Sequence, residues 1–135
     1  MISLIVGNKG SGKTKKLIDR INTDAKKSDG ALVCIDKGTK LTYDINYVVR
    51  LVDADHYKIS SFEALYGFIC GLCAGNYDIT HLYVDAILKI GGRDLEALGM
   101  FFDKVAPVLE EAGAEMVLTV SCDESDLPET VKKYL

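Results

Sequence analysis

Short apolar runs alternate with amphipathic segments along the chain. Five runs have the length of buried strands, and they span residues 2–6, 31–35, 47–52, 81–85 and 115–121. Between them, apolar residues recur at helical spacing over 14–27, 61–74 and 95–112, and a short helix closes the chain near 127–135. This alternation is typical of a mainly parallel sheet with helices on both faces. We therefore expect an α/β fold, with one three-layer α/β/α domain over 1–135 and a sheet of about five strands.

Local signals refine several of these boundaries. Ser60 and Glu63 have the spacing of a capping box, with Ser60 as the N-cap of the second helix. Arg50 makes the 47–52 strand a plausible edge strand. The polar residues that follow it, at 53–56, suit either a turn or a metal site, and aspartate's preference for turns favours the turn.

Residues 7–14 carry the most informative motif. They read Gly-Asn-Lys-Gly-Ser-Gly-Lys-Thr and match the P-loop pattern G-x-x-x-x-G-K-T, directly between a predicted strand and a predicted helix. Glycines let the backbone curl so that its N–H groups face an anion, and the helix adds its positive dipole end. Lys13 supplies a charge for the outer phosphates, and the Thr14 hydroxyl is placed to bind Mg²⁺. The predicted phosphate-binding residues are Gly7, Asn8, Lys9, Gly10, Ser11, Gly12, Lys13 and Thr14. The alternative is a glycine-rich turn that holds no ligand.

A second stretch, at 81–85, is an apolar strand that ends in Asp85. This is the Walker B pattern, whose carboxylate reaches the magnesium ion through water. We therefore predict Thr14 and Asp85 as the metal-side residues, with Mg²⁺ and ATP as the cofactors. Adenine is favoured by absence, since the chain has no Asn/Thr-Lys-x-Asp guanine motif after its last strand.

Hydrolysis requires a group that activates water and a positive charge for the transition state. Ala86 stands where many P-loop ATPases carry a glutamate after the Walker B aspartate. Asp94 and Glu96 are the substitute candidates for the base, although a surface glutamate on a helix is commonly just solvated. Arg93 is the candidate cation, acting on its own site or on that of a neighbouring subunit. Ser121 and Asp123 are candidate sensors of the γ-phosphate, whereas Thr119 is expected to be buried.

Composition narrows the class of protein. The chain is 48% hydrophobic and carries a net charge of −4, which argues against disorder and against a broad nucleic-acid surface. The longest mostly apolar stretch, 62–74, is too short to cross a bilayer, and no signal peptide is recognisable, so we expect a cytoplasmic protein. The pair Cys70 and Cys73 lies within a predicted helix, where core packing is favoured over a zinc or redox site.

The chain resembles a group of short bacterial P-loop proteins, some of which are labelled ATP-binding or twitching-motility proteins after the pilus-retraction ATPase. The stretches that carry this resemblance are 7–19, 77–85, 88–94 and 127–134. It implies ATP binding and a RecA-like core of the additional-strand type, with one strand between the P-loop strand and the Walker B strand. It does not imply a motor, because retraction ATPases have a separate N-terminal domain and a glutamate at the Walker B strand.

Three functions fit these observations. The favoured one is an Mg–ATP-binding module that regulates a protein partner and hydrolyses ATP slowly or not at all. The second is an ATPase activated by a partner or by homo-oligomer formation, with Arg93 as the group supplied in trans. The third is a small-molecule kinase, which is disfavoured because the chain has only three arginines and no basic lid segment.

Overall fold

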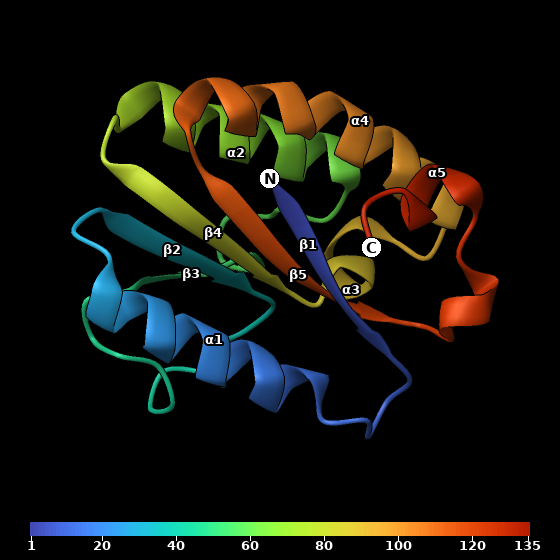
Figure 1. The fold of residues 1–135 in the computed structure, drawn as a ribbon, viewed down its shortest axis with the longest axis horizontal. Coiled ribbons are helices and arrows are strands. Elements are labelled where there is room, and N and C mark those ends of the chain that lie inside the picture. The colour runs from blue at the N-terminus through green and yellow to red at the C-terminus, as the bar shows by residue number, and fades with distance from the viewer.

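The computed structural model describes residues 1–135, and a parallel five-stranded sheet forms its centre (Figure 1). The strands are β1 (Ile2–Gly7), β2 (Ala31–Asp36), β3 (Arg50–Asp53), β4 (Ile79–Asp85) and β5 (Glu115–Ser121). Their order is β1-β5-β4-β2-β3, and every neighbouring pair is parallel. The predicted α/β class and the mainly parallel sheet are confirmed. Strand β5 lies between β1 and β4, which is the arrangement that the resemblance implies.

Helices cover both faces of the sheet (Figure 1). Helix α1 (Lys13–Lys27) packs on one face together with the segment 37–49, which connects β2 to β3. The other face carries α2 (Phe62–Gly75), α3 (Ile87–Gly91), α4 (Leu95–Ala112) and α5 (Glu129–Lys132), and a 3₁₀ turn, η1 (Glu124–Asp126), precedes α5. The result is the predicted three-layer α/β/α arrangement.

The strands read as continuous apolar runs because both of their faces are buried. On β2, Cys34 packs on the α1 side and Ile35 on the α2–α4 side, and both are completely buried. On β4, Tyr83 and Val84 divide in the same way. Side chains alternate along a strand, so Asp85 shares the α1 side with Tyr83.

Three local predictions were wrong. The third predicted strand, 47–52, is in fact the four-residue edge strand β3 at Arg50–Asp53, and Tyr47 before it is 95% exposed. The N-cap of α2 is Ser61, whose hydroxyl accepts from the Ala64 N–H, and not Ser60. Helix α3 has no counterpart among the predicted elements.

The remaining structural predictions concern polar and cysteine clusters. Asp53 accepts hydrogen bonds from the N–H groups of Gly38 and Asp55, so the 53–56 stretch is a turn. Cys70 and Cys73 are free, partly buried cysteines on α2, and no group of three or more potential metal ligands occurs anywhere in the structure. None of the helices combines the length and the apolar character that a membrane span requires.

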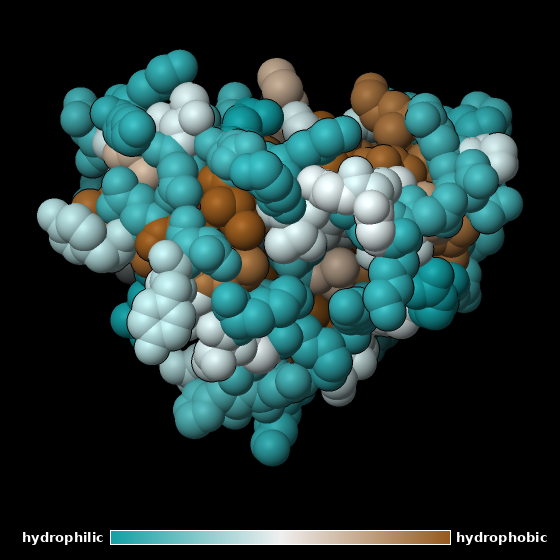
Figure 2. Space-filling view, turned by 90° about the horizontal axis from the view of Figure 1, so that it is seen from below, coloured by the Kyte–Doolittle hydropathy of each residue, from teal (hydrophilic) through white to brown (hydrophobic).

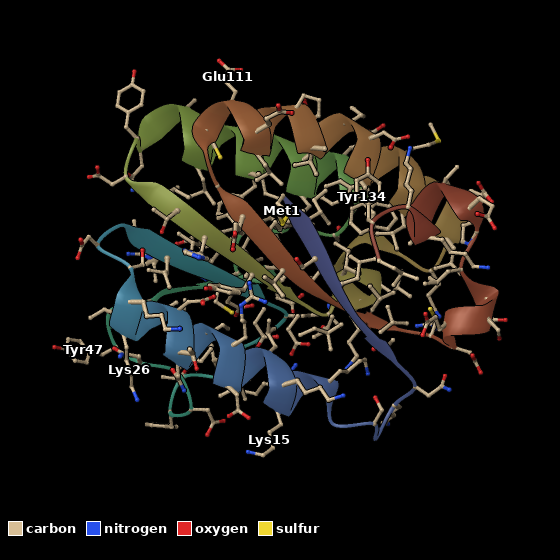
Figure 3. The ribbon with its side chains drawn as sticks, viewed as in Figure 1. Met1, Lys15, Lys26, Tyr47, Glu111 and Tyr134 are labelled. Atoms are coloured by element: carbon tan, nitrogen blue, oxygen red, sulfur yellow. The ribbon has the colours of Figure 1, made fainter.

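The outer surface of the α1 layer is largely hydrophilic, with hydrophobic residues visible between the polar ones (Figure 2). Lys15 and Lys26 of α1 project away from the sheet, and so does Tyr47 from the neighbouring segment (Figure 3). The solvent face of α1 is therefore distinct from its N-terminal end, where the motif of residues 7–14 lies.

Candidate functional site

A cavity of about 430 Å³ opens at the carboxyl end of the sheet. It is formed by the connections that follow β1, β2, β4 and β5, which is where ligands bind in open parallel sheets. Five lining side chains are cationic and only one is a carboxylate. The lining residues are Asn8, Lys9, Gly10, Lys13, Thr14, Lys40, Asp85, Ala86, Lys89, Arg93 and Ser121. In a chain with a net charge of −4, this is a strong local concentration of positive charge.

The loop between β1 and α1 turns tightly and depends on its glycines. Gly10 and Gly12 adopt φ values of 88° and 82°, in the left-handed region that only glycine enters without strain. A Cβ on Gly7 would collide with the side chain of Ser11, so the loop closes tightly over this position. Of these three glycines, Gly7 and Gly12 occupy the fixed positions of the motif.

The N-terminus of α1 lacks the groups that normally stabilise a helix start. Its N-cap, Gly12, makes no side-chain hydrogen bond, and its first turn contains no acidic residue. Lys13, Lys15 and Lys16 lie there instead, at the positive end of the helix dipole. This placement is unfavourable by roughly 0.3–1 kcal/mol per charge at exposed sites. By contrast, Ser61 caps α2 and Asp94 caps α4.

Lys13 is the most enclosed of the lining cations. It is only 8% exposed and forms no ion pair. Oδ2 of Asp36 is the one buried side-chain nitrogen or oxygen without a hydrogen-bond partner, so the Lys13 ammonium itself remains accessible from the cavity that it lines.

Asp85 lies at the centre of a small hydrogen-bonding group. Its carboxylate is 2% exposed and lies 3.4 and 3.5 Å from the Thr14 hydroxyl through its two oxygens. The hydroxyl of Thr119 on β5 donates to its Oδ1 atom. The structure therefore brings Thr14 and Asp85 together as the sequence predicted. Thr119 is fully buried, also as predicted, but its contact with Asp85 was not anticipated.

Lys40, on the 37–49 segment, lines the same cavity and contacts Asp85. Its Nζ is 3.1 Å from Oδ1 of Asp36 and 3.7 Å from Oδ2 of Asp85. Burial raises the pKa of Asp36, although the hydrogen bond and charge of Lys40 oppose that rise. Partial burial pulls the pKa of Lys40 down, but the hydrogen bonds and charges of both aspartates outweigh burial and raise it.

Of the residues predicted to act in hydrolysis or as sensors, two line the cavity and the others do not. Arg93 lines the cavity and donates from its guanidinium to the carbonyl of Ser121, 3.1 Å away, so both belong to the site. Asp123 is not part of the lining and caps η1 by accepting from Ser125, whose backbone N–H and hydroxyl hold the pKa of Asp123 below its usual value. Glu96 is exposed in the first turn of α4 and does not line the cavity.

Sequence reasoning missed two of the lining lysines, Lys40 and Lys89. A signal for Lys40 existed, since loops at the carboxyl ends of parallel strands lie on the side of the sheet where ligands bind. Lys89 belongs to the unpredicted α3, so nothing in the pattern placed it. Comparison of the sequence with models of known protein families and with curated proteins finds no match.

Proposed function

We propose that this chain binds a nucleoside triphosphate together with Mg²⁺, with ATP as the ligand, and acts as a regulatory or partner-dependent nucleotide-binding module. The observation that carries the proposal is Lys13, a largely buried residue without an ion pair, in a cavity lined by four other cations. A triphosphate carries several negative charges along an extended chain, which suits cations supplied by the three connections that follow β1, β2 and β4. A single phosphate would need fewer of them.

The groups around Asp85 support the magnesium part of the proposal. Mg²⁺ prefers oxygen ligands and is commonly held by one or two carboxylates together with substrate phosphates and water. Asp85 and the Thr14 hydroxyl offer such oxygens beside the phosphate cradle. When bound, the ion would neutralise charge on the outer phosphates. Lys13 would bind those phosphates, and the glycine loop would orient the chain with its N–H groups.

The same lining argues for slow hydrolysis. Asp85 is the only carboxylate that lines the cavity, and Ala86 follows it. Neither Glu96 nor Asp123 lines the cavity. The guanidinium of Arg93 donates to the carbonyl of Ser121 in the same chain, which favours a role in its own site over a role in a neighbouring subunit. Binding without a built-in base is typical of a module whose nucleotide state is read by another protein.

Calorimetric titration with ATP in the presence of Mg²⁺ tests the proposal, with Lys13→Ala as the variant. Lys15→Ala is the matched control, since Lys15 lies two residues further along, is 82% exposed and pairs only with Asp19. Loss of a charge-assisted contact of about 1.5–3 kcal/mol should weaken ATP binding by about 10- to 150-fold in Lys13→Ala. Lys15→Ala should bind as the wild type does.

Wild-type protein that binds no ATP, or equal losses in the two variants, would overturn the proposal. Phosphate release measured in parallel tests the regulatory reading. Tight binding with little turnover supports a module, whereas steady release that rises more than linearly with protein concentration supports an ATPase activated by assembly.

A further inference from the structure

Two buried carboxylates end neighbouring strands at the carboxyl end of the sheet, and one of them, Asp85, lines the cavity. Asp36 ends β2 and Asp85 ends β4, and the two residues are direct partners in the register of this parallel pair. Neighbouring strands are about 4.8 Å apart, so the side chains are close. Asp36 is 3% exposed and Asp85 is 2% exposed. Two like charges this close and this deeply buried require a cation between or beside them.

Lys40 is the only cation that pairs with either carboxylate. It contacts both, at 3.1 Å for Asp36 and 3.7 Å for Asp85. One ammonium balances only one of the two negative charges. The second oxygen of Asp36, Oδ2, is buried and has no hydrogen-bond partner at all. The pair therefore keeps unused capacity for positive charge.

The position of this ammonium conflicts with the proposed metal ion. The two oxygens of Asp85 lie 3.4 and 3.5 Å from the Thr14 hydroxyl, on which the magnesium assignment rests. Lys40 approaches Oδ2 of the same carboxylate. An ammonium and a divalent ion that share one carboxylate repel each other strongly in a buried site. Both cannot occupy it in this arrangement.

We propose that Lys40 is a tethered counter-ion, which holds the Asp36–Asp85 pair when nucleotide is absent and is displaced when Mg²⁺ arrives with the nucleotide. The divalent ion then balances both carboxylates, and Asp36 is the second acidic residue of the metal site. This inference rests on the proposed nucleotide-binding function. It couples Mg²⁺ binding to the position of the 37–49 segment, so that each changes the equilibrium of the other.

The displaced lysine gives the bound state a means of being read. Lys40 belongs to the segment that also carries Tyr43 and Tyr47, which are 97% and 95% exposed. Ile45 and Val49 anchor the same segment on the α1 side of the sheet. Release of Lys40 removes the segment's ion pairs with the sheet ends while leaving this apolar anchor in place.

The first test compares ADP affinity with excess Mg²⁺ and with EDTA, by calorimetry. The quantity measured is the ratio of the ADP affinity with Mg²⁺ to the ADP affinity with EDTA. In Lys40→Met the metal no longer competes with an ammonium, and without metal the two carboxylates repel the phosphates. The ratio should therefore rise about tenfold or more over wild type, within the usual range for linked sites. Asp36→Asn should lower it.

The matched control is Lys37→Met, because Lys37 lies in the same segment and pairs with the exposed Asp55 at 2.8 Å. It should leave the ratio unchanged. If Lys40 instead binds phosphate directly, Lys40→Met weakens ADP equally with and without Mg²⁺, the ratio stays constant and the inference is overturned. Failure of the proposed function looks different, because wild-type protein then shows no Lys13-dependent binding under either condition.

A second test needs no variant. Acetylation of lysines, read by mass spectrometry, should label Lys40 faster with Mg–ADP than with ADP in EDTA, because the displaced ammonium leaves its two carboxylates. Lys37 serves as the internal reference, and its labelling should not change. Equal or slower labelling of Lys40 with Mg–ADP overturns the inference, whether or not Lys40→Met folds.

Discussion

The buried hydroxyl of Thr119 allows a direct measurement of how the protein holds its central carboxylate. Thr119 is fully buried and donates to Asp85, which is itself 2% exposed. Thr119→Val keeps the shape of the side chain and replaces the hydroxyl with a methyl group. The carboxylate then loses a donor at a place that water reaches poorly.

The expected cost follows from two opposing contributions. A hydrogen bond to a charged group contributes about 1.5–3 kcal/mol. Burying the additional methyl group recovers up to about 0.8 kcal/mol. Thr119→Val should therefore lower the free energy of unfolding by about 1–2 kcal/mol. With urea m-values of about 1–3 kcal/mol/M, the midpoint should fall by about 0.3–2 M.

A double-mutant cycle with Asp85→Ala isolates the hydrogen bond from packing. Urea unfolding of the four proteins, followed by circular dichroism in EDTA at neutral pH, gives the coupling energy. Thr119→Val should cost about 1–2 kcal/mol beside Asp85 and close to nothing, or even stabilise, beside Ala at that position. An equal cost in both backgrounds would show that the hydroxyl acts through packing alone and would refute the reasoning.

Two further predictions concern the scaffold. A Cβ on Gly30 would lie 2.6 Å from the backbone oxygen of Asp78, so Gly30→Ala should lower the free energy of unfolding by about 1–3 kcal/mol. Gly67 is exposed on α2 and a Cβ there meets nothing within 4 Å, so Gly67→Ala should raise it. A stabilised Gly30→Ala variant would contradict this packing. Hydrogen bonding from Lys133 lowers the pKa of Asp103, so this carboxylate stabilises the fold above its unfolded pKa of about 3.9 and loses that effect as pH falls through the lower folded value. The difference in melting temperature between wild type and Asp103→Asn should therefore be present at pH 7 and vanish in acid, and a difference that persists there would argue against the assignment.

The layer architecture could be predicted because burial on both faces leaves a plain signature in the strands. Runs such as residues 31–35 and 115–121 are apolar at successive positions, and a parallel sheet between helices is the usual reason. The edge strand failed this logic. Tyr47 and Val48 have high strand propensity, yet both are exposed, and pairing with β2 begins only at Arg50. Propensity there was overridden by tertiary pairing.

The site was predictable only where one continuous stretch encodes it. Residues 7–14 are adjacent in sequence, so their spacing alone indicates the cradle. Thr119 and Lys40 join Asp85 because β5 and β2 flank β4, and strand order is not written in hydrophobic periodicity. Glu96 shows the reverse error, since its proximity to Arg93 in sequence does not carry it into the cavity. Contacts set by topology therefore needed the structure.

The chain as a whole is acidic, whereas the lining of the cavity is basic. Five of the 16 basic residues line the cavity, but only one of the 20 acidic residues does. Such a site favours a polyanion over the transition state of its hydrolysis, because charge attracts phosphate whereas cleavage also needs a positioned base. On this reasoning, a nucleotide bound here would persist rather than turn over, and its presence would be read through what it displaces. Lys40 is the side chain best placed for that, because the cation that enters must take the carboxylates that Lys40 now holds.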